Sequence, residues 1–364
     1  MDGNVIVGQS GGPTSVINSS LAGVYKTAID RGAKKVYGML HGIKGLLDGQ
    51  YVDLSEKINS TMDIDLLKRT PSSYLGSCRY KLPEISEDRE TFDKIFKILD
   101  DLDIKYFFYI GGNDSMDTIK KLSDYAIVTG SDIKFMGVPK TIDNDLVGTD
   151  VSFGFQSAVD IATSTIDCIH TTAASHSRVF IVELMGHKTG WLTLHAGVAG
   201  GSDVILIPEI PYDLDKVVEA INKRSSQKKH FTILAVAEGI ISKEEMEFTK
   251  KELKEIRKRE HFPSAAYRIG AGIMERTGQE VRVTVPGHVQ RGGSPCAYDR
   301  VLASRLGAKA AELIMNEEYG YMVCVKNNQM DKIALREVAG KLKTVNPDAG
   351  IIKEAKAMGI CFGD

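Results

Sequence analysis

The chain has 364 residues, and its 46 Lys and Arg against 48 Asp and Glu give a formal net charge of −2. This near balance excludes a bulk attraction to nucleic acid or to an anionic membrane surface. With 43% hydrophobic and 26% charged residues, the composition is that of a globular protein rather than a disordered chain. The length favours about two domains of roughly 150 residues each.

The five cysteines are scattered and show no CxxC or zinc-site spacing, which favours reduced thiols in the cytoplasm. The first residues, MDGNVIVGQSGG, lack the basic start and long apolar core of a signal peptide. No apolar run approaches the length of about 18 residues that spans a bilayer. We therefore expect a cytoplasmic protein that does not bind a membrane.

Strands and helices alternate in the first part of the chain. The expected strands are residues 4–7, 35–40, 106–110 and 134–138, with a weaker one at 126–128. The expected helices are residues 15–31 and 116–122. This alternation is typical of βαβ units and predicts a parallel sheet.

A second α/β region follows a long amphipathic helix expected at residues 156–172. Its expected strands are residues 178–184, 204–207 and 232–237. Residues 243–260 are charged and helix-forming, and we interpret them as a solvated surface helix rather than a binding patch. Two α/β lobes predict ligand sites at the carboxyl ends of the strands.

Two glycine-rich turns follow expected strands. Residues 8–14, GQSGGPT, let the backbone approach an anion at a helix N-terminus, although a plain tight turn is an equal alternative. The segment is neither a Walker A loop nor a GxGxxG fingerprint. Residues 111–115, GGNDS, contain Asp114, which would repel a phosphate unless a cation intervenes. Asp114 or Ser115 could instead simply cap the helix.

Residues 139–145, PKTIDND, place two carboxylates beside Lys, Thr and Asn just after a strand. A hydroxyl that attacks a phosphate needs a base, and the phosphate needs a cation, so one Asp can serve each need. The alternative is a polar loop built on Asx turns.

Two later segments are rich in groups that recognise phosphate. Residues 185–191 read MGHKTGW, and residues 287–295 read GHVQRGGSP. Together with Arg178 and Arg282 they supply His and Arg within turns, and Arg binds phosphate as a rigid fork. Any one of these arginines could instead form a surface salt bridge.

These five segments, in this order, resemble the 6-phosphofructokinase family from SGGP at Ser10 to Arg300. The resemblance implies an α/β fold of two Rossmann-like lobes with the active site in the cleft between them. It implies a donor-binding lobe of residues 1–155 plus 290–340 and a fructose 6-phosphate lobe of residues 156–289 plus 341–364. It also implies a homodimer or homotetramer whose subunits share the sugar-phosphate site.

The resemblance further assigns roles to single residues. Asp143 matches the base that takes the proton of the sugar 1-hydroxyl, and Thr141 matches a contact to the sugar or the transferred group. Asp145, with Asn113, matches the residues that place Mg²⁺, and Arg79 matches an Arg that neutralises the donor. The donor-binding positions are Gly11, Gly12, Asn113, Asp114 and Lys140. The sugar-phosphate positions are Arg178, Met185, Gly186, His187, Glu238, Arg282, His288 and Arg291, of which Arg178 and Arg282 match arginines that reach across from the partner subunit.

Two positions bear on the phosphoryl donor. ATP-dependent bacterial members carry Gly where this chain has Asp114 and Lys140, whereas pyrophosphate-dependent members carry Asp and Lys. We therefore expect a reversible pyrophosphate-dependent enzyme. The alternatives are an ATP-dependent 6-phosphofructokinase and a non-catalytic sugar-phosphate-binding subunit. An oxidoreductase is disfavoured because GxGxxG is missing after the first strand.

The chain also departs from the family pattern. Asn113 stands where many members have Asp, which removes one charge near the metal. His187 stands where many have Arg. Leu21 and Tyr25 replace the arginines that bind a nucleotide effector in allosteric bacterial enzymes, so regulation by ADP or phosphoenolpyruvate is not expected.

Overall fold

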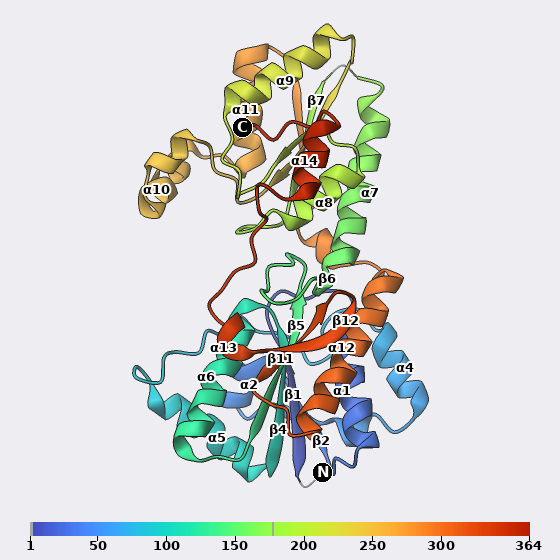
Figure 1. The fold of residues 1–364 in the computed structure, drawn as a ribbon, viewed down its shortest axis with the longest axis vertical. Helices are drawn as coiled ribbons and strands as arrows, with labels where there is room; N and C mark the ends of the chain where they lie inside the picture. Colours follow the sequence, from blue (N-terminus) through green and yellow to red (C-terminus); the bar gives the residue numbers. More distant parts are fainter. Residues whose placement is uncertain (1–2, 177) are drawn as a thin grey trace. The chain divides into compact units, whose positions relative to one another are not determined.

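The computed structural model describes residues 3–176 and 178–364. The chain divides into two compact units, a first unit of Met1–Ser157 with Arg291–Leu342 and a second unit of Ala158–Gln290 with Lys343–Asp364. Each unit is a sheet with helices on its faces (Figure 1), which confirms the predicted α/β class with two lobes. Which ligand each lobe binds stays a prediction. Within the described ranges, no helix is both long and apolar enough to cross a membrane.

The first unit is built on a sheet of order β12-β11-β5-β4-β1-β2-β3, with the short β6 paired to β5. Its strands are β1 (Asn4–Gln9), β2 (Val36–Met39), β3 (Tyr51–Asp53), β4 (Ile104–Gly111), β5 (Lys134–Thr141), β6 (Phe153–Gly154), β11 (Tyr321–Lys326) and β12 (Gln329–Ala334). Only the two edge strands, β3 and β12, pair in the antiparallel sense with their neighbours. The central strands are therefore parallel, as the alternation in the sequence predicts.

Helices cover both faces of this sheet and make a separate core on each face (Figure 1). One face carries α1 (Ile17–Asp30), α3 (Leu54–Lys57), α4 (Thr61–Arg69) and α12 (Ala297–Met315). The other carries α2 (Gly42–Leu47), α5 (Arg89–Asp101), α6 (Asn113–Thr129) and α13 (Leu335–Val338). In α5, residues Phe92, Ile95, Phe96 and Leu99 are buried at helical spacing, and this apolar stripe fixes the helix on the sheet.

The weak strand expected at residues 126–128 is wrong. These residues form the last turns of α6, which ends where Gly130 adopts a φ of 71°. The buried positions of α6, from Met116 to Ala126, keep helical spacing. Ile127 and Val128 are 78% and 77% exposed, so these two side chains do not pack against the sheet. Burial of the preceding residues outweighs the strand preference of two β-branched side chains.

The second unit has a wholly parallel sheet of order β10-β7-β9-β8. Its strands are β7 (Val179–Leu184), β8 (Val204–Leu206), β9 (Thr232–Ala237) and β10 (Val281–Thr284). Its helices include α7 (Phe155–Ala173), which begins in the first unit, and α8 (Trp191–Ala199), α9 (Leu214–Ser226), α11 (Ala265–Thr277) and α14 (Gly350–Ala357). Helices α9 and α11 cover one face, while Gly197 of α8 lies against Ile205 and Ala235.

The last residues of the chain belong to the second unit. The Ile205 N–H donates to the carbonyl of Cys361 at 2.9 Å, and the Cys361 N–H donates to the carbonyl of Asp203 at 3.0 Å. Phe362 is buried beside them. This segment therefore pairs with the edge strand β8 and shields it from other chains.

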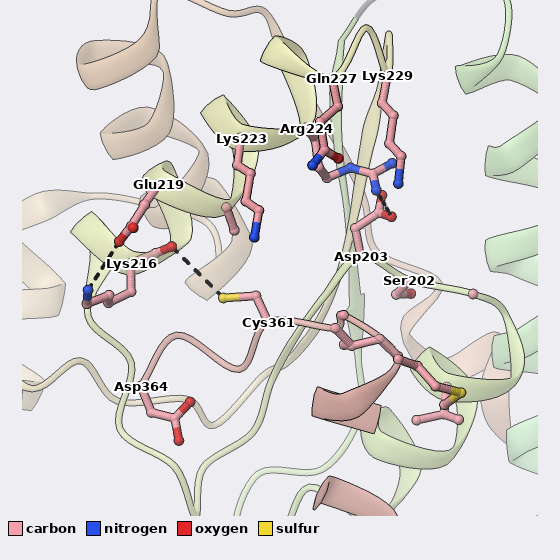
Figure 2. A pocket seen from close by; sticks show the side chains of 16 residues that line it. Ser202, Asp203, Lys216, Glu219, Lys223, Arg224, Gln227, Lys229, Cys361 and Asp364 are labelled. Atoms are coloured by element: carbon pink, nitrogen blue, oxygen red, sulfur yellow. Dashed lines mark hydrogen bonds and ion pairs between the residues drawn. The ribbon is translucent and has the colours of Figure 1, made fainter. Parts of the chain in front are cut away.

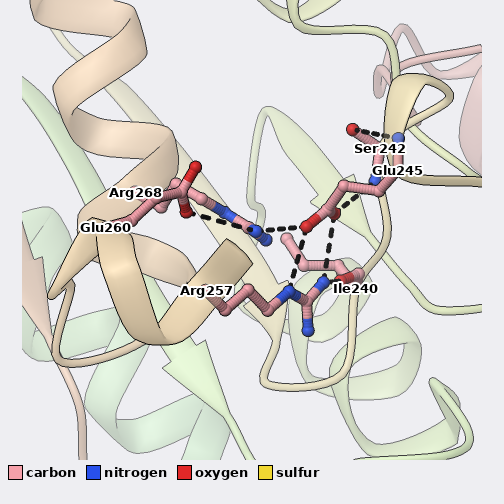
Figure 3. Close-up of polar contacts among 6 residues, drawn as sticks. All are labelled: Ile240, Ser242, Glu245, Arg257, Glu260 and Arg268. Carbon is pink, nitrogen blue, oxygen red and sulfur yellow. Dashed lines mark hydrogen bonds and ion pairs between the residues drawn. The ribbon is translucent and has the colours of Figure 1, made fainter. Parts of the chain in front are cut away.

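Residues 243–262 form an arm that stands away from the second sheet (Figure 1). The surface helix predicted at 243–260 is here a short 3-10 helix, η1 (Glu244–Glu247), followed by α10 (Lys250–Glu260). The Glu245 carboxylate accepts hydrogen bonds from Arg257 Nε at 2.9 Å and Nη2 at 3.0 Å, and it also pairs with Arg268 of α11 (Figure 3). Glu245 thus fastens the arm to the body of the unit.

Candidate active site

Three of the motifs lie together at one edge of the first sheet. Strands β1, β4 and β5 are parallel neighbours, and the segments that follow them begin at Ser10, Gly112 and Ile142. Because the carboxyl ends of parallel strands meet at one edge, the two glycine turns and the TIDND segment are adjacent. The chain runs to β2 on one side of β1 and to β4 on the other, and this reversal is where α/β sheets bind ligands.

Two glycines of the first glycine turn, Gly11 and Gly12, have a structural reason to be glycine. Gly11 has a φ of +77°, which favours glycine. A Cβ atom at Gly12 would lie 2.7 Å from Cζ of Arg291, so a side chain at this position would displace that guanidinium from where it packs. The Gly11 N–H donates to the carbonyl of Cys78 at 3.0 Å, and Ser77 Oγ donates to the carbonyl of Gly11 at 2.6 Å. These bonds join the turn to the segment that carries Arg79.

Lys140 crosses from β5 to this turn. Its side chain is buried, and Nζ donates to the carbonyl of Gly12 at 2.7 Å. Burial, together with the nearby cations Arg291 and Arg79, lowers the pKa of Lys140 to about 7, and the attraction of Asp143 and Asp145 only partly opposes this. The group is therefore close to half charged at neutral pH.

Asp145 and Asn113 form a polar pair at the same edge. Asn113 Nδ2 donates to Asp145 Oδ2 at 2.8 Å. The Oδ1 atoms of both residues are buried and accept no hydrogen bond from the described part of the chain. Burial raises the pKa of Asp145, against hydrogen bonds from Thr141 and Asn113 that lower it. Two oxygen acceptors without donors fit a cation that would pair with them.

No group of three or more His, Cys, Asp or Glu side chains in the described ranges is arranged to hold a metal ion. Magnesium is commonly held by one or two carboxylates together with substrate phosphates and water.

A left-handed residue separates the two aspartates. Asn144 has a φ of 51°, is buried, and accepts the Ser152 N–H through Oδ1 at 3.1 Å. The Asp143 N–H donates to Thr141 Oγ1 at 3.1 Å. Asn144 thus turns inward between the half-buried Asp143 and Asp145. The bond between Thr141 and the Asp143 N–H is a local turn of the kind that the polar-loop alternative expects, whereas the Asn144 bond spans eight residues. The roles of the two carboxylates stay predictions.

Arg79 and Asp114 are both exposed. Asp114 lies in the first turn of α6, where a carboxylate favours the helix N-terminus. Arg79 has no hydrogen bond or ion pair with any residue that the structure describes. Its guanidinium is therefore available to a ligand.

The second unit gathers another set of predicted residues at the carboxyl ends of β7 and β9. The Gly186 N–H donates to Glu238 Oε1 at 3.3 Å, and the Met185 N–H donates to Gln290 Oε1 at 3.2 Å. Gln290 is buried in η2 (Gly287–Arg291) and donates to the carbonyl of Gly287. Gln290 was not among the predicted residues, although it lies within the GHVQRGGSP motif. His187 and His288 are exposed in these segments.

Arg178 and Arg282 are not part of that set. Arg178 precedes β7, and Arg282 is the second residue of β10, so both lie toward the amino ends of the strands. A strand of this length separates Arg178 from Met185 by roughly 20 Å. Both arginines form ion pairs with Glu280, a residue that nothing in the sequence marked. Their distance from Glu238 agrees with the predicted role toward a partner subunit, which stays a prediction.

A separate cavity of about 690 Å³ lies in the second unit between α9 and the C-terminal segment (Figure 2). Its wall includes an ion pair between Arg224 and Asp203 at 2.6 Å, together with Lys223 and Cys361. Asp203 precedes β8, so the cavity lies near the amino ends of the strands and apart from Glu238. None of the predicted site residues lines it.

Comparisons with known proteins agree with this arrangement. The family model described as "Phosphofructokinase" matches residues 4–314. An "ATP-dependent 6-phosphofructokinase" of Spirochaeta thermophila is 44% identical over 98% of this chain and 96% of its own length. The "ATP-dependent 6-phosphofructokinase 3" of Bacteroides thetaiotaomicron is 40% identical over 97% and 98%. A crystal structure of a pyrophosphate-dependent phosphofructokinase from Nitrosospira multiformis has a TM-score of 0.84 at 27% identity, covering 99% of this chain and 92% of that one.

The expectation of pyrophosphate as donor is wrong. Four curated relatives that are 34% to 44% identical to this chain are named ATP-dependent, whereas the pyrophosphate-dependent structure from Nitrosospira multiformis is 27% identical. The Asp114 side chain is exposed on the first turn of α6. Lys140 is buried against a carbonyl and its pKa is lowered to about 7, so it is not the fixed positive charge that the expectation required.

Proposed function

Since this chain belongs to the phosphofructokinase family, we propose that it is an ATP-dependent 6-phosphofructokinase, which transfers the γ-phosphoryl group of ATP to the 1-hydroxyl of fructose 6-phosphate. The products are fructose 1,6-bisphosphate and ADP, and the reaction belongs to glycolysis in the cytoplasm. The observation that carries the proposal is the junction of the β1 turn, the β4 turn and the TIDND segment at one sheet edge. The names of the relatives support ATP as the donor.

We assign the proton transfer to Asp143. Its carboxylate lies after β5 beside the glycine turns, and a base there can take the proton of the 1-hydroxyl as the oxygen attacks. The transferred group passes through a transition state whose charge is spread over its oxygens. Arg79 and the protonated fraction of Lys140 offset that charge. Arg291, which the resemblance assigns to the sugar phosphate, lies against Gly12 of the first glycine turn, and we assign it to the donor as well.

Mg²⁺ is the cofactor that the residues fit. The buried oxygens of Asp145 and Asn113 would hold it. When bound, the ion neutralises phosphate charge.

We assign the sugar phosphate to the second unit, at Met185, Gly186, His187, Glu238 and His288. Glu238 is held near the β7 end by the Gly186 N–H, a position suited to accept from a sugar hydroxyl. Arg178 and Arg282 would serve the 6-phosphate of a partner subunit in a homodimer or homotetramer. Their pairing with Glu280 keeps both guanidinium groups beside each other.

The proposal is tested by identifying the product. Purified protein is incubated with Mg-ATP and fructose 6-phosphate, and ³¹P NMR follows the sugar phosphates. We expect a new phosphate signal at C1 together with ADP. Release of inorganic phosphate without a bisphosphate would show hydrolysis only, and no turnover would favour the non-catalytic sugar-phosphate-binding alternative.

A further inference from the structure

Arg79 lies on a long segment without helix or strand, which we call the Arg79 loop. The loop covers residues 70–88, between the end of α4 and the start of α5. The Arg79 side chain is exposed and makes no polar contact with the described residues. The position of its guanidinium therefore depends on how the backbone on each side of it is held.

The part of the loop before Arg79 is fixed by the end of β1. Gln9 is fully buried, and its Oε1 accepts from Ser73 Oγ at 2.6 Å and from the Leu75 N–H at 3.1 Å. Ser77 Oγ donates to the carbonyl of Gly11 at 2.6 Å. This side of the loop is thus tied to the strand that leads into the first glycine turn.

The part after Arg79 is fixed by a buried lysine of α6. Lys121 is 5% exposed, and its Nζ donates to the carbonyl of Leu82 at 3.0 Å. The same ammonium pairs with Glu84 at 2.7 Å and with Asp117 at 3.0 Å. An ammonium has three N–H donors, so these three partners use its full capacity. Leu82 and Glu84 are loop residues, whereas Asp117 belongs to α6, so the lysine joins the loop to the helix.

We propose that Lys121 is a positioning residue for phosphoryl transfer, which holds the Arg79 loop so that Arg79 faces the phosphates of the donor. The inference rests on the proposed function, because it gives Arg79 a donor to act on. A buried ammonium paired with two carboxylates could simply stabilise the fold, with no effect on catalysis. Here, however, the one carbonyl among the described residues that accepts from its ammonium belongs to Leu82, three residues after Arg79, and the helix that carries Lys121 begins at Asn113 in the same site.

The test compares two lysines that are adjacent on α6. Lys121→Met keeps the length of the side chain and removes the ammonium. Lys120→Met is the matched control, since Lys120 pairs with Asp124 at 2.7 Å on the surface and contacts no loop residue through a polar bond. We expect Lys121→Met to lower kcat/KM for ATP by about 10- to 100-fold, the effect of a misplaced positioning group, and to leave KM for fructose 6-phosphate unchanged. Lys120→Met should match the wild type.

Combination with Arg79→Ala separates positioning from general stability. If Lys121 acts through Arg79, Lys121→Met causes little further loss in the Arg79→Ala background, because coupled residues are not additive. A loss of the same size in both backgrounds would overturn the proposal. If Lys121→Met does not fold, Glu84→Ala is used instead, because it removes only the ion pair between Lys121 and the exposed Glu84. This variant must show a smaller loss of kcat/KM for ATP, and that loss must also disappear in the Arg79→Ala background.

Hydrogen exchange gives a readout that does not depend on activity. Amides of residues 77–88 should exchange faster in Lys121→Met and at the wild-type rate in Lys120→Met. Unchanged exchange in this loop would also overturn the proposal. An inactive wild-type protein would overturn the proposed function itself, whereas an active wild type with additive losses would overturn only the role of Lys121.

Discussion

Asp143 is the residue on which the proposed chemistry depends. It follows β5, and its N–H is held by Thr141 Oγ1. Replacement by Asn keeps the size of the side chain and removes the base. We expect Asp143→Asn to lower kcat by about 10²- to 10⁴-fold, with little change in KM or in thermal stability, as measured by steady-state rates and a melting curve. Asp124→Asn, on the exposed face of α6, is the matched control. A kcat near that of the wild type would assign the base elsewhere.

Lys140 links function to stability through its lowered pKa. The group has a pKa of about 7 in the fold and about 10.5 when unfolded, so unfolding takes up a proton between these values. Below pH 7 the folded state carries the full free-energy cost of burying the Lys140 cation, and this cost disappears as the pH rises toward 10.5. The Lys140→Met variant does not carry this cost. Its unfolding free energy should therefore exceed that of the wild type by a margin that shrinks by about 2 kcal/mol between pH 7 and pH 9.

Urea unfolding of both proteins at the two pH values measures that change. The same variant should bind ATP more weakly at pH 7, because it lacks the protonated fraction of Lys140. A stability difference that is independent of pH would show that Lys140 does not titrate in this range.

At the scale of single elements, the turn between Asp143 and Asp145 is held by Asn144. Its left-handed φ of 51° and its bond to the Ser152 N–H favour Asn at this position. We expect Asn144→Ala to lower the free energy of unfolding by about 1–3 kcal/mol, since it leaves a buried donor without a partner. Asn144→Gly restores the backbone freedom but not the bond, so it should fall between Ala and wild type. Equal stability of all three proteins would contradict this role.

The arm of residues 243–262 offers a test of a half-buried ion-pair network. Glu245 accepts two hydrogen bonds from Arg257 and forms an ion pair with Arg268. Burial raises the pKa of Glu245, but its hydrogen bonds and these two arginines lower it by more, so the net pKa lies below its usual value. We expect Glu245→Ala to speed proteolytic cleavage within the arm, because it removes the carboxylate that two half-buried arginines share and leaves, among the described residues, Arg257 only the Ile240 carbonyl and Arg268 only the more distant Glu260. Glu255→Ala, exposed on α10, is the control. Equal cleavage rates would show that the arm is held by other contacts.

The sequence predicts four of the eight strands of the first sheet and three of the four strands of the second, because β1, β4, β5 and β9 are apolar runs that end at glycine or polar residues. It misses strands β3, β6, β10, β11 and β12. It misplaces residues 126–128, where local preference opposes burial in α6. It also misses contacts between residues far apart in the chain. Glu280 pairs with Arg178 across 102 positions, and Lys121 reaches Leu82 across 39, and no local pattern marks either pair.

At the scale of the whole molecule, the same limit explains the error over the donor. The residue type at position 140 predicts a fixed charge, but the fold buries Lys140 against the Gly12 carbonyl and lowers its pKa. The effect of a side chain on a ligand depends on its burial and partners, which the sequence does not state. The motifs themselves mark the sheet edges well, because glycine and aspartate follow consecutive parallel strands there.

The central claim is that ATP is the donor for fructose 6-phosphate. Initial rates with saturating fructose 6-phosphate and Mg²⁺, measured across equal concentrations of ATP and of pyrophosphate, test it most directly. We predict a kcat/KM for ATP that exceeds the value for pyrophosphate, and formation of fructose 1,6-bisphosphate in step with ADP. A higher kcat/KM for pyrophosphate would contradict the claim and would show that Asp114 and Lys140 govern the donor despite their positions in the fold.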